Sequence, residues 1–258
     1  FQMLALRPEG MQVVPSFLHV RFAHLDCKMI VATAAKDMPV ISPSVWLHFL
    51  PFFLSRPSEA QFAVFQMMFG LITAGIVLGA CAERIRYTAI TWFLVIWSIL
   101  VYAPMAHMVW GGGFLANLPA GLVTLDFAGG TVVHICAGTT GLALACYLGK
   151  RISRTMKRAH SIPMVFFGCF LLWFGWFGFN GGSGLAANGQ AISAMTVSMI
   201  AAVCAMAAWA VVQYLHVGRV GVLGLAAGSI AGLVAITPAA GYVTPITSIP
   251  IGLVGGVL

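Results

Sequence analysis

Long runs of apolar residues, separated by short polar segments, dominate the chain from about residue 60 onward. Six of these runs are long enough to cross a bilayer, since a spanning helix needs about 20 residues. They cover residues 61–82, 88–110, 127–149, 162–184, 191–215 and 221–240, and a seventh begins near residue 246. The pattern predicts an all-α integral membrane protein with about six full spans and part of a seventh.

Residues 1–56 do not share this pattern. Their most apolar stretch, residues 40–54, is interrupted by Pro43 and Pro51 and is too short for a membrane span. We assign no fold to this segment and expect residues 57–258 to form the membrane domain.

The composition agrees with a membrane solvent. The chain is 60% hydrophobic and 7% charged, whereas a soluble domain carries about 25% charged residues. The net charge of +7 comes largely from short loops, so it indicates membrane topology and not nucleic-acid binding. The six cysteines show no CxxC pair and no zinc-type spacing. We therefore expect no metal and no cofactor.

The loops alternate in charge, which sets the orientation. Basic residues occur in 83–87, 150–161 and 216–220, and none occurs in 111–125, 185–190 or 241–245. Because basic loops face the cytoplasm, the first predicted span runs from outside to inside and the following spans alternate.

This orientation gathers several candidate residues at the outer depth. They are Phe65, Phe69, Trp110, Asp126, Phe179 and Ser183. The two phenylalanines of the first span are four residues apart and share one helix side, as do Phe179 and Ser183. A cation stripped of water needs aromatic faces and an oxygen in compensation. Interfacial aromatic belts and core packing are the alternative explanation for the rings.

Two ionisable residues of the third span each allow a structural and a functional interpretation. Asp126 heads the span, where it fits a helix N-cap and also a cation site. His134 lies eight residues further on, about 12 Å deeper. Ionisable side chains at membrane depth usually face a pathway, although a histidine can also bond to a neighbouring helix for packing. His107, one turn from the outer face, fits a structural interfacial role.

Several segments resemble the ammonium transporters (Amt/Mep/Rh), in family order and with family-like spacing. They are FQMMFG at 65–70, LGACAERIRY at 78–87, VYAPMAHMVWGGG at 101–113, LDFAGGTVVHICAG at 125–138, GWFGFNGGSG at 175–184 and LGLAAGSIAGLVAITPAAGYV at 223–243. The resemblance covers the chain from about Glu59 onward, and Trp110 and Ser183 favour the Amt branch.

The resemblance implies a role for each candidate residue. Phe69 and Phe179 resemble the stacked pair that closes the outer mouth of the pore. Phe65, Trp110 and Ser183 resemble the outer ammonium site, and Asp126 resembles the acid that supports it. His134 resembles the first of two pore histidines.

The same resemblance implies transport of ammonium or ammonia through a hydrophobic pore in the plasma membrane. It implies no enzymatic activity, a homotrimer, and a possible cytoplasmic signal-transduction regulator. The chain matches the third to eighth family spans and the start of the ninth, so we expect part of a longer protein that lacks the first two and the last spans. An ammonium sensor of the same fold and a non-functional truncated product remain alternatives. A membrane enzyme would need a second polar cluster at matching depth.

Overall fold

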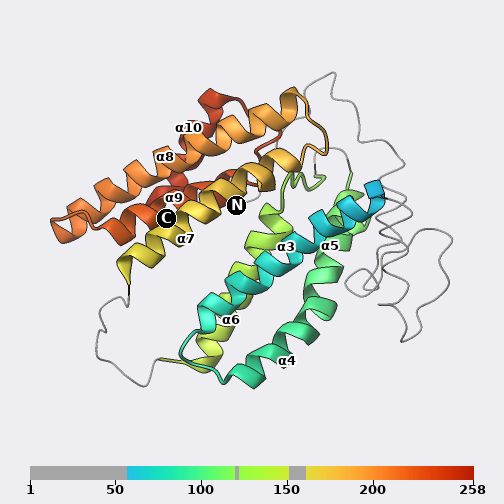
Figure 1. Cartoon of the computed structure of the whole chain (residues 1–258), viewed down its shortest axis with the longest axis horizontal. Coiled ribbons are helices and arrows are strands. Elements are labelled where there is room, and N and C mark those ends of the chain that lie inside the picture. Colours follow the sequence, from blue (N-terminus) through green and yellow to red (C-terminus); the bar gives the residue numbers. More distant parts are fainter. Residues whose placement is uncertain (1–56, 120–121, 151–160) are drawn as a thin grey trace. The chain divides into compact units, whose positions relative to one another are not determined.

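The computed structural model describes residues 57–119, 122–150 and 161–258, which form helices with no β-strand among them (Figure 1). The prediction for residues 1–56 lies outside the described residues. The described chain divides into two compact units. Unit 1 holds residues 125–130 and 161–258, and unit 2 holds the remainder.

Unit 2 is built from three membrane-length helical segments. Its elements are α3 (Pro57–Cys81), α4 (Tyr87–Trp97), η2 (Ser98–Tyr102), α5 (Ala103–Trp110), η3 (Phe114–Ala116), η4 (Gly130–Ile135) and α6 (Cys136–Leu148). The π-helical η2 joins α4 to α5 without a break. A second π-helical segment, η4, leads into α6. Its first residue, Gly130, is also the last residue of the segment 125–130 that belongs to unit 1.

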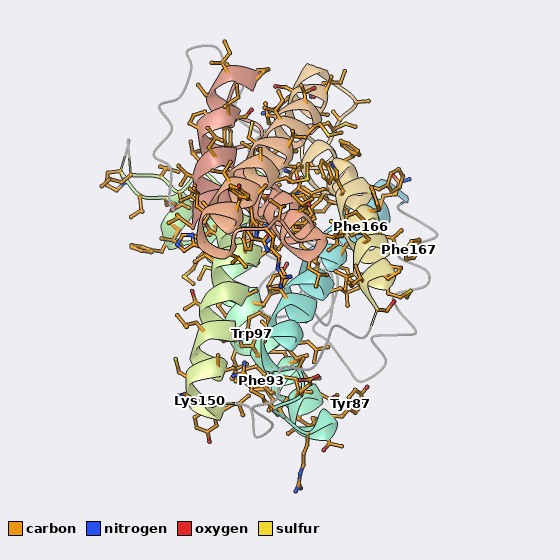
Figure 2. The ribbon with its side chains drawn as sticks, turned by 90° about the vertical axis from the view of Figure 1, so that its left-hand side faces the viewer. Tyr87, Phe93, Trp97, Lys150, Phe166 and Phe167 are labelled. Carbon is orange, nitrogen blue, oxygen red and sulfur yellow. The ribbon has the colours of Figure 1, made fainter. Side chains whose placement is uncertain are left out.

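Small residues and hydrogen bonds hold the helices of unit 2 together. A Cβ added to Gly141 of α6 would lie 2.9 Å from the Cβ of Ala80, so α3 and α6 approach closely there. Trp97 Nε1 donates to Thr140 Oγ1 at 3.1 Å, which links α4 to α6. Figure 2 shows Trp97 on α4, with Tyr87 and Lys150 near the end of the same unit.

Unit 1 is a bundle of four helices. Its elements are α7 (Ile162–Trp176), η5 (Phe177–Gly181), α8 (Gly189–Val217), α9 (Val222–Ile236) and α10 (Pro245–Val257). Helices α8, α9 and α10 pack against one another around buried small residues such as Ala194 and Ala201 of α8 (Figure 1). Many large apolar side chains face outward; one of them is Phe167 of α7, which is 59% exposed (Figure 2).

Polar side chains begin three of these helices. Ser161, Asn188 and Thr244 each accept a backbone N–H of the first turn. Such N-caps satisfy donors that have no partner within the helix.

The prediction of an all-α membrane fold is confirmed. Five helical segments within the described residues are long and apolar enough to cross a membrane: Gln61–Cys81, Tyr87–Ala116, Gly130–Leu148, Ile162–Gly181 and Gly189–Val217. Each coincides with one of the first five apolar runs.

The sixth apolar run differs from its predicted length. The run 221–240 contains a helix of 15 residues, α9, and not a continuous span of about 20. Pro238 lacks the N–H that a longer helix requires. Tight turns follow, with Ala239 N bonded to Ile236 O at 2.9 Å. The seventh run forms α10, of 13 residues.

Candidate functional site

Three of the predicted aromatic residues form one group in unit 2. The ring centroids of Phe65 and Phe69 lie 4.9 Å apart at an interplanar angle of 76°. Phe69 and Trp110 lie 5.4 Å apart at 84°. Both contacts are edge-to-face, an arrangement that the ring quadrupoles favour. The prediction that Phe65 and Phe69 share one side of α3 is confirmed, and α5 adds Trp110 to them.

A sharp helix end positions Trp110. Gly111 N and Gly113 N both donate to the carbonyl oxygen of His107, at 2.9 and 3.1 Å, so α5 stops directly after Trp110. Gly112, at φ 75°, supplies the left-handed turn that glycine adopts readily. His107 therefore takes part in this helix end through its backbone.

Asp126 caps the N-terminal end of the helix that carries His134. Its Oδ1 accepts the N–H of Gly129 at 2.8 Å and that of Gly130 at 2.6 Å. The side chain is buried, with 7% exposed. A negative charge at this position complements the positive end of the helix dipole. The capping interpretation of Asp126 is confirmed, and its role in a cation site stays a prediction.

His134 lies on the π-helical segment η4, one residue before α6 begins. Its side chain is 9% exposed, and the neighbouring Val132 and Val133 are fully buried. An imidazole thus sits within an apolar stretch of a membrane span. Single π-helical turns occur frequently at functional sites, because the wider turn shifts which side chains share a face.

Phe179 and Ser183 lie together in unit 1, on and directly after the π-helical segment η5. Ser183 Oγ donates to the carbonyl oxygen of Phe179 at 2.7 Å, as their spacing of four residues predicts. The Phe179 ring packs on Trp176, with centroids 5.2 Å apart. Because the Ser183 hydroxyl hydrogen is engaged, the oxygen lone pairs are what Ser183 can offer to a bound cation.

The seven predicted site residues divide between the two units. Unit 2 carries Phe65, Phe69, Trp110 and His134, and unit 1 carries Asp126, Phe179 and Ser183. The predicted gate of Phe69 with Phe179 joins residues of different units and stays a prediction. No group of three or more His, Cys, Asp or Glu side chains within the described residues could hold a metal ion.

One polar residue of this region is absent from those singled out from the sequence. Asn180 directly follows Phe179 on η5 and is fully buried. Its Nδ2 donates to Ser198 Oγ of α8 at 2.7 Å. The sequence did contain a signal for Asn180, namely an amide side chain within an apolar run. Such a polar side chain requires a hydrogen-bond partner on a neighbouring helix.

The helices and the placement of the polar residues define a multi-pass α-helical membrane protein. The model of the Ammonium Transporter Family matches residues 40–258, so the chain belongs to this family. The matched range begins inside the segment 1–56, for which the sequence predicts no fold.

Individual relatives agree. The chain is 49% identical over 198 residues to an ammonium transporter of Bacillus subtilis, covering 77% of this chain and 48% of that protein. The chain spans about half the length of the curated relatives it matches. The crystal structure of Saccharomyces cerevisiae Mep2 aligns with a TM-score of 0.69 and 41% identity, over 76% of this chain and 45% of that one. A structure titled Sensor Amt Protein aligns with a TM-score of 0.75 and 28% identity, over 94% and 63%.

Proposed function

We propose that the protein transports ammonium or ammonia across the plasma membrane through a hydrophobic pore. The observation that carries this proposal is the family match over residues 40–258. Relatives more than 40% identical to the chain are themselves named ammonium transporters. The membrane-length apolar helices supply the setting that such transport needs.

The proposed outer site consists of Phe65, Trp110 and Ser183, with Asp126 behind it. The support is family membership and the position of each residue along its span. Aromatic faces attract a cation by the ring quadrupole, which offsets part of its lost hydration. Ser183 adds an oxygen whose own hydrogen is already donated to Phe179. Asp126 contributes by holding the start of its helix in place.

Transport beyond this site proceeds through a narrow apolar path. Phe69 and Phe179 act as the gate in the proposal, and His134 lines the pore below them. Ammonium releases its proton before the pore, because a neutral molecule crosses an apolar region at far lower cost than a charge. His134, buried on η4, offers an imidazole that can accept or donate a hydrogen bond to ammonia.

The relatives of the chain are transporters and not enzymes. For this protein we propose the same absence of enzymatic activity. We further propose a homotrimer and a cytoplasmic signal-transduction protein as regulator of the whole protein.

A sensor is the second candidate function. The alignment with the structure titled Sensor Amt Protein covers 94% of this chain, a larger share than the Mep2 alignment. A sensor would use the outer site to bind ammonium and would signal without net uptake.

Growth on limiting ammonium tests the proposal. The chain is expressed in a microbe that lacks ammonium transporters, beside a chimera in which the Bacillus subtilis relative supplies the rest of the family's length. We expect the chimera to restore growth. A chimera that reaches the membrane without restoring growth would contradict transport and favour the sensor. Rescue by the chain alone would contradict the proposed mechanism, since the pore would need nothing outside residues 1–258.

Single variants of the chimera test the site. His134→Ala and Asp126→Ala should each reduce ammonium uptake at least about tenfold, as expected for loss of a charge-assisted or desolvated contact. His216→Ala is the control, because this exposed histidine forms its hydrogen bond with the Val212 carbonyl of its own helix. Unchanged uptake in both site variants would contradict the site assignment.

A further inference from the structure

The amide of Asn180 has a fixed orientation. Its Nδ2 lies 2.7 Å from Ser198 Oγ, and Ser198 Oγ donates to the carbonyl oxygen of Ala194 at 2.6 Å. A serine hydroxyl has one hydrogen, and the Ala194 carbonyl receives it. Ser198 Oγ must therefore accept from Asn180, which only the NH₂ group of the amide can supply. The assignment of nitrogen and oxygen follows from the hydrogen bonds themselves.

This orientation turns Asn180 Oδ1 away from Ser198. The oxygen is buried and has no hydrogen-bond partner within the part of the chain that the structure describes. The whole residue is 0% exposed. Buried acceptors are nearly always hydrogen-bonded, and an exception indicates a bound water, an ion or a functional role. Bulk water does not reach this oxygen, because protein atoms enclose the residue completely.

The segment that carries Asn180 is held tightly against α8. A Cβ on Gly181, the next residue, would lie 2.6 Å from Met195 Cγ, so the two segments approach closely at this glycine. The Asn180–Ser198 bond then fixes the position of the amide. Phe179 stands on the same π-helical segment, and Ser183, in the turn that follows it, donates a hydrogen bond to the Phe179 carbonyl oxygen. Oδ1 is thus a rigid acceptor within one helical turn of two proposed site residues.

We propose that Asn180 Oδ1 is a binding acceptor for an N–H donor, ammonium or ammonia, beside Phe179. This inference rests on the proposed function. The chemistry required is a small hydrogen-bond donor that arrives without its hydration shell, and water shares that chemistry. The permeating nitrogen species is favoured because Asn180 directly follows Phe179, one residue of the proposed gate, on η5. Burial around Oδ1 strengthens a hydrogen bond to a positively charged donor.

Uptake kinetics in the chimera separate binding from packing. Asn180→Leu removes the acceptor and the Ser198 bond at similar volume, whereas Ser198→Ala removes the same bond and leaves Oδ1. We expect Asn180→Leu to raise the KM for ammonium at least about tenfold and Ser198→Ala less than about threefold. Asn180→Asp, which keeps an oxygen acceptor, should stay nearer the parent. Equal KM changes in Asn180→Leu and Ser198→Ala, or a change in maximal rate alone, would overturn the proposal and indicate packing or a bound water.

A binding measurement makes the result independent of transport. The purified protein is heated in detergent with ammonium chloride or with potassium chloride at equal ionic strength, because a ligand that binds the native state raises the Tm. We expect ammonium to raise the Tm of the parent and of Ser198→Ala, and not that of Asn180→Leu. An equal rise in Asn180→Leu would overturn the acceptor. A parent that gains stability without uptake would contradict transport while supporting the acceptor.

Discussion

Arg84 donates a hydrogen bond from Nη1 to the carbonyl oxygen of Gly149 at 3.0 Å, across 65 residues of sequence. Its Nη2 donates to the carbonyl oxygen of Ala80 at 2.5 Å. One guanidinium therefore joins the C-terminal ends of α3 and α6, where the carbonyl groups lack helical partners and the helix dipoles are negative. Arg84 therefore stabilises the fold, in addition to marking the loop 83–87 as a basic loop that sets the orientation.

Arg84→Ala should lower the free energy of unfolding of the chain by about 1–3 kcal/mol, since two charge-assisted hydrogen bonds are lost. Arg84→Lys should recover part of this loss, because an ammonium keeps the charge without the planar fork that reaches both carbonyls. Unfolding in detergent, followed by circular dichroism, measures the change.

Arg86→Ala is the matched control. Arg86 lies two residues further on, also carries a positive charge, and is exposed. Its loss should change the stability by less than about 0.5 kcal/mol. Equal destabilisation by the two alanine variants would show that net charge matters and that the helix-end bonds do not.

The cap at Asp126 predicts that two variants will separate its effect on stability from the effect of its charge on ammonium uptake. Asp126→Ala removes the acceptor of both the Gly129 and Gly130 N–H groups and should cost about 1–2 kcal/mol of stability. Asp126→Asn keeps an oxygen acceptor and should cost less. If the carboxylate charge serves the outer site, the Asn variant of the chimera should fold normally and still take up ammonium more slowly. Normal uptake by Asp126→Asn would restrict Asp126 to capping.

The pattern of apolar runs predicted the helices well because their signal is local. A run of about 20 apolar residues leaves a helix as the only open-chain structure that satisfies its backbone in lipid. The shorter α9 shows where this reasoning fails. Its run stays apolar through residue 240, whereas the helix ends at Ile236, before Pro238. Hydropathy describes the solvent of a segment and does not show where its backbone leaves the helix. Proline alone does not decide this either, since α10 continues past Pro250.

The candidate site was predictable where its residues share a helix. The spacing of Phe65 and Phe69 placed them on one side of α3, and the rings are in contact. The partner of Asn180 was not predictable, since Ser198 lies 18 residues away on another helix. Tertiary packing alone determines that contact. The π-helical segments η2, η4 and η5 of the described residues likewise depend on packing and have no sequence pattern of their own.

Two tryptophans of α7 form a matched pair for a third prediction. Trp176 Nε1 donates to Thr237 Oγ1 of the segment after α9 at 2.9 Å. Trp173 Nε1 is buried and has no hydrogen-bond partner in the described residues. Trp176→Phe should therefore destabilise the chain by about 1–2 kcal/mol more than Trp173→Phe. Only Trp176→Phe removes the N–H group that donates to the buried Thr237 hydroxyl. Equal unfolding midpoints for the two variants would contradict a stabilising role for the Trp176–Thr237 bond.

The glycines of the α8–α9–α10 bundle give the last prediction. A Cβ on Gly232 of α9 would lie 2.5 Å from the Cβ of Ala205 on α8, closer than two carbon atoms can approach. Gly232→Ala should thus separate the two helices and lower the stability by about 1–3 kcal/mol. A Cβ on Gly168 of α7 meets nothing within 4 Å, so Gly168→Ala should leave the stability unchanged or raise it by about 0.5–1 kcal/mol through the better helix propensity of alanine. Thermal unfolding of both variants in detergent tests this contrast. Similar losses of stability in both variants would contradict the prediction. They would show that the close approach of α8 and α9 is not the reason for glycine at position 232.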